Sequence, residues 1–347
     1  MQLDTIYCGD SLKILADFPA QSVHLAFADP PFNIGYVYDK YDDNRPDAEY
    51  VEWTRQWMAA VQRVLTPTGS FYIAIGDEFA ADIRILGREL GLHLRNWIIW
   101  HYTFGQATKF KFARAHTHIF YFTMDRTVFT FNDQLLRFPS ARHTEYQDLR
   151  ANPSGRLPDD VWDDFPRVCG TFKERAGFHG CQMPEALLMR IVQASSSPGE
   201  TVLDPFVGSG TTAVEAQLLG INCVGVDVSP LCRLISRVKT QSWAHLAQIE
   251  AASEYVAPCV RDTKQQRLFR TVEDREFPEG PVKDFFDLAE MIARSDNSRR
   301  RRDPVDTYGR RLIDLGVITE DEDRAMRAAA ERSIAIARDF CTVEQDG

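Results

Sequence analysis

A short motif near the amino terminus combines a carboxylate, two prolines and an aromatic ring: Asp29, Pro30, Pro31 and Phe32. An amino group on an aromatic ring is a poor nucleophile, because its lone pair is delocalised into the ring. Asp29 and a carbonyl of the stiff proline pair can accept both N–H bonds of such an amine and free its lone pair, while Phe32 stacks on the ring. The motif predicts a clamp for an exocyclic amine. Without a ligand, the same residues would form an ordinary turn at a strand end.

A second motif lies far downstream and has the form of a turn that approaches a ligand closely. It comprises Asp204, Pro205, Phe206, Gly208, Gly210 and Thr211. The two glycines lack a Cβ, so the backbone there can come close to a bound molecule. Asp227 ends the next expected strand, where a carboxylate can accept ribose hydroxyls. The motif predicts a nucleotide-like cofactor. A dinucleotide-dependent dehydrogenase and a turn without a ligand are the alternatives.

Strands and helices alternate along the chain in an order that places both motifs at strand ends. Strands are expected at residues 23–28, 70–75, 94–100, 116–123, 201–203 and 221–226, and helices at 47–65, 78–90, 184–194 and 211–219. Asp29 and Asp204 each follow one of these strands. The order predicts an α/β fold with a doubly wound, mostly parallel sheet and helices on both faces.

Composition narrows the class of protein. The chain has 347 residues, 44% of them hydrophobic, which favours one large domain with an insertion or appendage. No apolar run approaches the roughly 20 residues of a membrane span, and the start lacks a signal-peptide pattern, so a soluble cytoplasmic protein is expected. The seven cysteines form no C-x-x-C pair, which argues against a metal site and a disulfide scaffold.

The segments around both motifs resemble one enzyme family. Residues 7–36, with Gly9 and Asp10 ahead of the clamp, are similar to the amino-terminal part of S-adenosylmethionine-dependent DNA amino-methyltransferases. Residues 179–212 resemble the cofactor half of these enzymes, and the expected fold is then Rossmann-like. Because the clamp precedes the glycine turn with a long insert between them, the order is that of the β group. The resemblance covers roughly residues 4–245.

The resemblance implies roles for individual residues. Asp29 and a carbonyl of the proline pair would hold the target amine, and Phe32 would stack on a base flipped out of the duplex. The implied S-adenosylmethionine site comprises Asp10, Asp204, Pro205, Phe206, Gly208, Gly210, Thr211 and Asp227. Two positions depart from the family: Met183 stands where a lysine is usual, and Phe32 stands where tyrosine is commoner.

Segment 104–178 separates the two motifs and is the expected target-recognition insert. A net charge of −10 is unusual for a protein that binds nucleic acid, but basic residues outnumber acidic ones within this segment. Lys109, Lys111 and Arg114 are candidate phosphate contacts, and Arg142 is a candidate base contact, although each taken singly is more typical of a solvated surface. The loop at 33–46, with Tyr36, Tyr38 and Tyr41, is expected to close over the flipped base.

The expected domains are a catalytic domain at 1–260 and a helical carboxy-terminal extension at 261–347, with helices at 284–293, 304–315 and 321–338. The expected reaction is methyl transfer from S-adenosylmethionine to a base in double-stranded DNA at a specific sequence. Clamps that begin with Asp favour adenine N6 in this family, whereas an initial Ser favours cytosine N4. Cytosine N4, an RNA substrate, and a non-catalytic DNA-binding or cofactor-sensing module remain alternatives. The family is compatible with a homodimer and with a cognate restriction endonuclease.

Overall fold

The computed structural model describes residues 1–36, 41–106, 109–168, 182–261, 279–293 and 318–331. Its internal contacts divide the chain into two compact units. The first unit consists of Met1–Val168 and Met183–Pro230 and contains both motifs. The second consists of Cys169–Gln182 and Leu231–Gly347. The predicted domain boundary at residue 260 stays a prediction.

The first unit is built on one eight-stranded sheet with the strand order β1-β8-β7-β2-β3-β5-β4-β6. The strands are β1 (Thr5–Cys8), β2 (Val23–Ala28), β3 (Leu65–Ile75), β4 (His93–Gln106), β5 (Arg114–Thr123), β6 (Val161–Trp162), β7 (Thr201–Asp204) and β8 (Asn222–Asp227). Only β5 runs antiparallel to its neighbours within this sheet. The mostly parallel α/β sheet predicted from the alternating pattern is confirmed.

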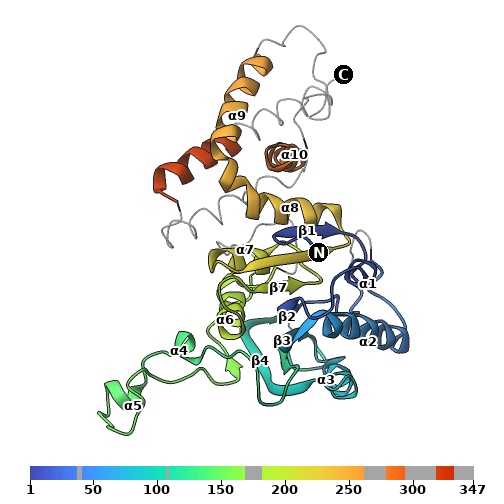
Figure 1. The fold of residues 1–347 in the computed structure, drawn as a ribbon, viewed down its shortest axis with the longest axis vertical. Helices are drawn as coiled ribbons and strands as arrows, with labels where there is room; N and C mark the ends of the chain where they lie inside the picture. Colours follow the sequence, from blue (N-terminus) through green and yellow to red (C-terminus); the bar gives the residue numbers. More distant parts are fainter. Residues whose placement is uncertain (37–40, 107–108, 169–181, 262–278, 294–317, 332–347) are drawn as a thin grey trace. The chain divides into compact units, whose positions relative to one another are not determined.

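Helices cover both faces of this sheet (Figure 1). The helices of the first unit are α1 (Ser11–Ala16), α2 (Asp47–Val64), α3 (Ala80–Glu89), α4 (Asp133–Leu136), α5 (Ala141–Thr144), α6 (Glu185–Ser195) and α7 (Thr211–Leu218). Residues of β2 alternate between two cores: Leu25 packs with residues of α6 and α7, and Ala26 with residues of α1, α2 and α3. This alternation follows from the two-residue period of a strand. Both faces of the sheet are therefore covered, as a parallel sheet requires.

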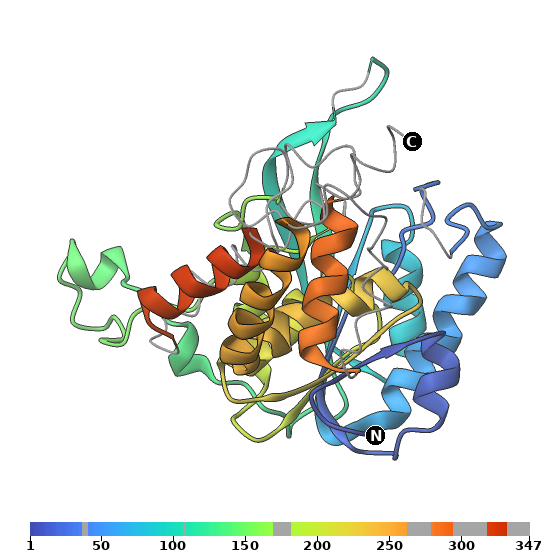
Figure 2. The same ribbon diagram turned by 90° about the horizontal axis from the view of Figure 1, so that it is seen from above.

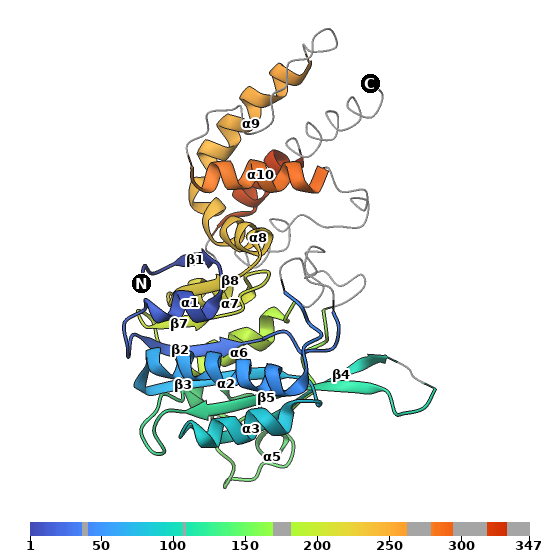
Figure 3. The ribbon, with the colours of Figure 1, turned by 90° about the vertical axis from the view of Figure 1, so that its right-hand side faces the viewer.

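β4 and β5 are longer than the predicted strands. They form a hairpin that extends beyond the rest of the sheet (Figures 2 and 3). β5 lies inside the predicted insert at 104–178, yet it pairs with both β3 and β4, and its residues Ile119 to Phe122 are buried. Residues 114–123 are thus part of the sheet. The burial of its apolar side chains between β3 and β4 favours this placement inside the sheet.

The described part of the second unit is helical. It contains α8 (Pro230–Gln241), the 3₁₀ turn η1 (Ser242–His245), α9 (Leu246–Arg261), α10 (Pro281–Ala293) and a helix over 320–331. Ile235, Ile249 and Phe285 belong to its core, beside an ion pair of 3.0 Å between Arg237 and Asp284. The predicted helix at 304–315 lies outside the described residues, as does the end of the one at 321–338. Among the described helices, none has the length and apolarity to cross a membrane.

Gly87 tests the packing of α3 on the sheet. A Cβ at this position would lie 2.6 Å from two ring atoms of Phe122, which is fully buried and stacked on Phe120. Gly87→Ala should lower the free energy of unfolding by about 1–3 kcal/mol through overpacking, although alanine favours helix. Urea unfolding followed by tryptophan fluorescence measures this change. Arg88→Ala, at an exposed neighbouring position, is the control; an unchanged or higher stability of Gly87→Ala would contradict the packing argument.

Candidate active site

The two motifs lie at the same edge of the sheet because their strands are neighbours. β2 pairs in parallel with β7, with Leu25 opposite Val202 and Ala26 opposite Leu203. Asp29 directly follows β2, and Asp204 is the last residue of β7. Parallel strands end at the same edge, which is where ligands bind in open α/β sheets. Residues far apart in the sequence are thus brought into one site.

The carboxyl groups of Asp29 and Asp204 have raised pKa values. The Asp29 side chain keeps partial access to the surface, yet the protein around its carboxyl and the charge of Asp204 raise its pKa to about 8, against the opposing charge of Arg167. Burial likewise raises the pKa of Asp204 to about 7, against hydrogen bonds from Thr212 and the Phe206 amide. A raised pKa means that the negative charge is costly there. A ligand with positive charge would relieve that cost.

One carbonyl of the clamp is already engaged. The hydroxyl of Tyr50 donates a 2.6 Å hydrogen bond to the carbonyl of Pro31. Among the described contacts, the carbonyl of Pro30 has no such donor, and it directly follows the Asp29 side chain in the sequence. Asp29 and the Pro30 carbonyl are therefore the pair of acceptors suited to an amine. Tyr50 lies in the expected helix at 47–65, and neither motif marks it; a tyrosine on a buried helix face is the signal that its hydroxyl needs a partner.

Phe32 is half-buried beside the end of β3. Its ring packs against the core formed with α2 and α3. A Cβ added at Gly76, just after β3, would lie 3.4 Å from the Phe32 ring and 3.9 Å from the guanidinium of Arg114. One part of the ring is thus held by the protein while another part remains accessible. This is the arrangement that a stacking residue requires.

The loop that follows the clamp is organised by the buried side chain of Asp43. Its carboxylate accepts hydrogen bonds from the backbone N–H groups of Asn33 (2.8 Å), Ile34 (3.1 Å) and Tyr36 (2.9 Å). The Asn33 side chain also exchanges two hydrogen bonds with the backbone of Arg45. Successive N–H groups that converge on one anion form a backbone nest. Closure of this loop over a base stays a prediction, and Tyr38 lies outside the described residues.

The backbone of the glycine turn is left-handed at both glycines. Gly208 and Gly210 have φ values of 51° and 83°, the left-handed region that favours glycine, and α7 begins directly afterwards. The Asp227 carboxylate accepts hydrogen bonds from the Gly208 N–H (2.9 Å) and the Ser229 N–H (2.8 Å). The Asp204 carboxylate accepts from the Thr212 hydroxyl at 2.5 Å. Both acids therefore stabilise the turn, and their contacts with a cofactor stay predictions.

The amino-terminal strand joins this turn from the other side. β1 pairs with β8, with Cys8 opposite Asp227, and the Gly9 N–H donates to the Asp227 carbonyl. Asp10 caps α1 by accepting from the Leu12 N–H at 2.9 Å, and its side chain is exposed. The hydroxyl of Ser11 donates to the carbonyl of Pro205. Asp10 thus lies next to the end of β8, and its contact with the cofactor stays a prediction.

Aromatic side chains of α2 connect the two motifs. Trp53 and Trp57 contact the ring of Phe206, with centroids 5.8 Å and 5.3 Å away. The same helix supplies Tyr50, which contacts Pro31. The clamp and the glycine turn are therefore positioned by one rigid element. Met183, the departure from the family pattern, is buried in the core with Leu187.

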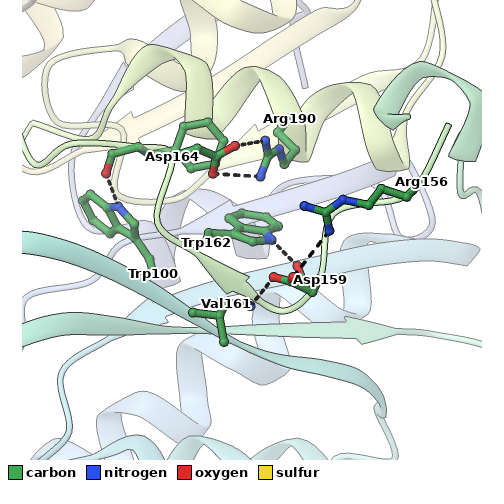
Figure 4. A network of polar contacts seen from close by, with 8 residues as sticks. Trp100, Arg156, Asp159, Val161, Trp162, Asp164 and Arg190 are labelled. Atoms are coloured by element: carbon green, nitrogen blue, oxygen red, sulfur yellow. Dashed lines mark hydrogen bonds and ion pairs between the residues drawn. The ribbon is translucent and has the colours of Figure 1, made fainter. Parts of the chain in front are cut away.

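Arg167 is a charged residue that influences the clamp and that no sequence motif marks. Its charge acts on Asp29, and its guanidinium lies 5.6 Å from the ring centre of Tyr102. The segment before it is fixed to the sheet and to α6 (Figure 4): the Trp100 indole donates to the Phe165 carbonyl at 2.7 Å, and Arg190 pairs with Asp164. Nothing in the local sequence pattern marks Arg167, because only these long-range contacts bring it to the clamp.

The four predicted nucleic-acid contacts do not form one surface. Lys109 and Lys111 are exposed beyond the paired part of the β4–β5 hairpin. Arg114, at its base, pairs with Asp77 (2.7 Å) and Glu78. Arg142 lies on α5, in a separate projection of the first unit (Figure 1), and pairs with Asp148 at 2.6 Å. Their contacts with DNA stay predictions. In the described part of the chain, no group of three His, Cys, Asp or Glu residues is arranged for a metal ion.

Comparison with known structures supports the fold. The chain is similar to the PvuII DNA methyltransferase, described as cytosine-N4-specific, with a TM-score of 0.54 and 20% identity over 68% of this chain and 86% of that one. It is also similar to M1.HpyAVI, solved as an S-adenosylmethionine complex, with a TM-score of 0.50 and 19% identity over 67% and 97% of the two chains. The architecture is the Rossmann-like fold of DNA methyltransferases.

Sequence comparison defines the family. The type II methyltransferase M.HpaI of Haemophilus parainfluenzae is 35% identical over 225 residues, which are 65% of this chain and 70% of that protein. The DNA adenine methyltransferase YhdJ of Escherichia coli K12 is 36% identical over 233 residues, or 65% and 78% of the two chains. The model of the N6/N4 DNA methylase family matches residues 23–236, from the strand before the clamp to α8. The chain therefore belongs to the N6/N4 DNA methylase family.

Proposed function

We propose that this protein transfers a methyl group from S-adenosylmethionine to the N6 amino group of an adenine flipped out of double-stranded DNA. The observation that carries the proposal is the meeting of the Asp29 clamp and the glycine turn at one sheet edge, through the pairing of β2 with β7. Adenine is favoured by the Asp at the start of the clamp and by the similarity to YhdJ, whose name describes it as a DNA adenine methyltransferase. The similarity to PvuII methyltransferase makes cytosine N4 the second candidate.

The residues at this edge fit the proposed cofactor. S-adenosylmethionine carries a sulfonium and supplies an electrophilic methyl group. Gly208 and Gly210 leave two positions of the turn without a side chain, Asp227 ends β8, and Asp10 caps the start of α1. Asp29 and Asp204 have raised pKa values, so a cationic ligand is favoured by relieving the cost of their charges. M1.HpyAVI, which has the same fold, is described as a complex with this cofactor.

The clamp performs the activation of the amine. An ionised Asp29 carboxylate and the Pro30 carbonyl accept the two N–H bonds of the target amine, which directs the nitrogen lone pair away from the ring. The Tyr50 hydroxyl fixes the neighbouring Pro31 carbonyl, and Phe32 holds the face of the base. When the amine becomes positively charged on methylation, the Asp29 oxygen that accepts its N–H is placed to take the proton. Positioning supplies most of the rate.

Methyl incorporation tests the reaction. Purified protein, methyl-labelled S-adenosylmethionine and unmethylated plasmid DNA should yield N6-methyldeoxyadenosine on digestion to nucleosides. Recovery of N4-methyldeoxycytidine instead would identify cytosine as the target base. Label found only in RNA would show that DNA is not the substrate. The absence of label from every polymer would overturn the enzyme assignment. Asp29→Ala should reduce incorporation at least about 100-fold with cofactor binding retained, and Asp17→Ala, at the exposed residue directly after α1, should not.

The binding of cofactor should depend on pH through Asp29. A carboxyl with a pKa of about 8 is largely protonated at pH 6, and a bound cation favours its ionised form, so binding releases protons. The dissociation constant should therefore fall as pH rises from 6 to 8, by up to about tenfold per pH unit. Titration calorimetry in two buffers of different ionisation enthalpy measures the released protons. Asp29→Asn should reduce this dependence and leave the part that Asp204 contributes through its own raised pKa of about 7, and an unchanged pH slope in that variant would show that Asp29 does not sense the cofactor charge.

We further propose that Asp43 positions the clamp through the loop after Phe32. Asp43→Asn keeps one acceptor oxygen where the native carboxylate uses both, so the Asn33–Tyr36 amides lose partners. Methyl transfer should fall at least about tenfold in kcat, with cofactor affinity within about twofold of native, and hydrogen exchange of these amides should rise. The matched control is Asp42→Asn, because within the described part of the loop exposed Asp42 accepts a hydrogen bond only from the Asn44 N–H. Equal losses in both variants would contradict a specific role of Asp43.

A further inference from the structure

The tip of the β4–β5 hairpin, defined here as residues 109–112, exposes two aromatic rings. Phe110 and Phe112 are 98% and 99% exposed. They alternate in sequence with the exposed residues Lys109 and Lys111. Single exposed apolar residues are common on protein surfaces, but two fully exposed phenylalanines at the end of a projection form an apolar surface without an intramolecular role. Such a tip suits a partner with both apolar faces and negative charge.

The strand directions place this tip beyond the edge that carries the clamp. β4 runs parallel to β2 and β3, because both β3 and β4 are antiparallel to β5. Its carboxyl end therefore points the same way as the end of β2, where Asp29 lies. The last residue of β3, Ile75, is opposite His118, and β5 extends from there back to Arg114, roughly 14 Å of extended chain. The tip lies farther still (Figure 3).

The base of the hairpin is fixed next to the stacking residue of the clamp. Arg114 pairs with Asp77 and Glu78, which follow β3, and both its guanidinium and the Phe32 ring lie close to Gly76. Farther along, the Tyr102 hydroxyl contacts the Thr117 hydroxyl across the two strands at 3.2 Å. These contacts fix the start of the hairpin at a defined position relative to a nucleobase stacked on Phe32.

We propose that the hairpin tip is a wedge that inserts Phe110 and Phe112 into the base stack of duplex DNA beside the flipped nucleotide. The inference rests on the proposed function. Flipping a base costs stacking energy, and aromatic side chains that stack on the neighbouring bases offset this cost. Apolar side chains inserted between base steps are an established means of unstacking DNA, and a two-stranded hairpin fits the major groove. The flanking lysines supply charge complementary to the phosphates.

DNA is favoured over a second protein chain as the occupant of the tip. The family acts on DNA, and the tip projects from the edge that holds the clamp. Two phenylalanines alone also offer far less than the roughly 1,000 Å² that a specific protein interface buries. Self-association through the tip is therefore an outcome of the test that would overturn the proposal.

The experiment compares Phe110→Ala/Phe112→Ala with the native protein on two forms of the same DNA. Methyl incorporation into duplex plasmid should fall by about tenfold or more in kcat/KM, because two stacking contacts are lost. Incorporation into the heat-denatured plasmid should change less than about twofold, because a single strand has no duplex stack to open. Native protein should also unwind closed-circular plasmid in a topoisomerase relaxation assay, and the double variant should not.

Three controls separate the possible causes. Leu149→Ala removes an equally exposed apolar side chain, 98% exposed, from another projection and should leave both assays unchanged. Lys109→Ala/Lys111→Ala should weaken duplex binding and reduce its salt dependence while plasmid unwinding at saturating protein remains. Cofactor affinity and the thermal unfolding midpoint should be the same in all variants.

The outcomes distinguish the wedge from the proposed function. If native protein labels DNA and the double variant labels and unwinds duplex as well as native, the wedge is wrong and the methyl-transfer function stands. If native protein labels no DNA, the function itself fails. Equal losses on duplex and denatured DNA would also overturn the wedge, and a changed elution volume of the double variant in size-exclusion chromatography would assign the tip to contacts between copies of the chain.

Discussion

The parallel pairing of β2 with β7 is the constraint on which the rest of the site depends. It places Asp29 and Asp204 at adjacent strand ends, although a long segment separates them in sequence. The cost of this arrangement is two carboxyl groups with raised pKa values in one enclosed region. A cationic ligand such as the proposed sulfonium would relieve that cost, whereas an anionic ligand would add to it. Sheet topology and ligand charge are thus linked through the same pair of residues.

The site is rigid because neighbouring elements satisfy its backbone groups. Tyr50 bonds the Pro31 carbonyl, Asp43 bonds three amides after Phe32, and Asp227 bonds the Gly208 amide. Each of these groups would otherwise need water or a ligand. Because α2 contacts both Pro31 and Phe206, a displacement of that helix would affect the clamp and the glycine turn together. Preorganisation of this kind is what positioning catalysis requires.

The segments between the two motifs do more than separate them. β4 and β5 complete the sheet and then continue as a hairpin, while residues after α5 return to the sheet as β6 and bring Arg167 to the clamp. The overall charge of −10 therefore says little about the surface next to the site. Cationic groups are placed locally, at Arg167 and at the hairpin tip, whereas Arg114 and Arg142 are engaged in ion pairs within the chain.

The sequence by itself determined the fold class, the strand that precedes each motif and the family. These features depend on local chemistry. Apolar residues recur with the two-residue period of a strand or the period of about 3.6 residues of a helix, the backbones of Gly208 and Gly210 have wide conformational freedom, and those of Pro30 and Pro31 are stiff. The pattern also predicted the buried strand at 116–123. It did not predict that this strand, although it lies inside the presumed insert, pairs with β3.

Only the tertiary structure decided how the polar groups are used. It showed that Tyr50 occupies the Pro31 carbonyl, that Asp204 and Asp227 stabilise the glycine turn, that Arg114 is paired, and that Arg167 acts on Asp29. The physical reason is that a hydrogen bond or ion pair depends on which distant residue arrives within about 3 Å. Strand order and helix packing determine which residues come this close, and neither can be predicted from the residues of the motif alone.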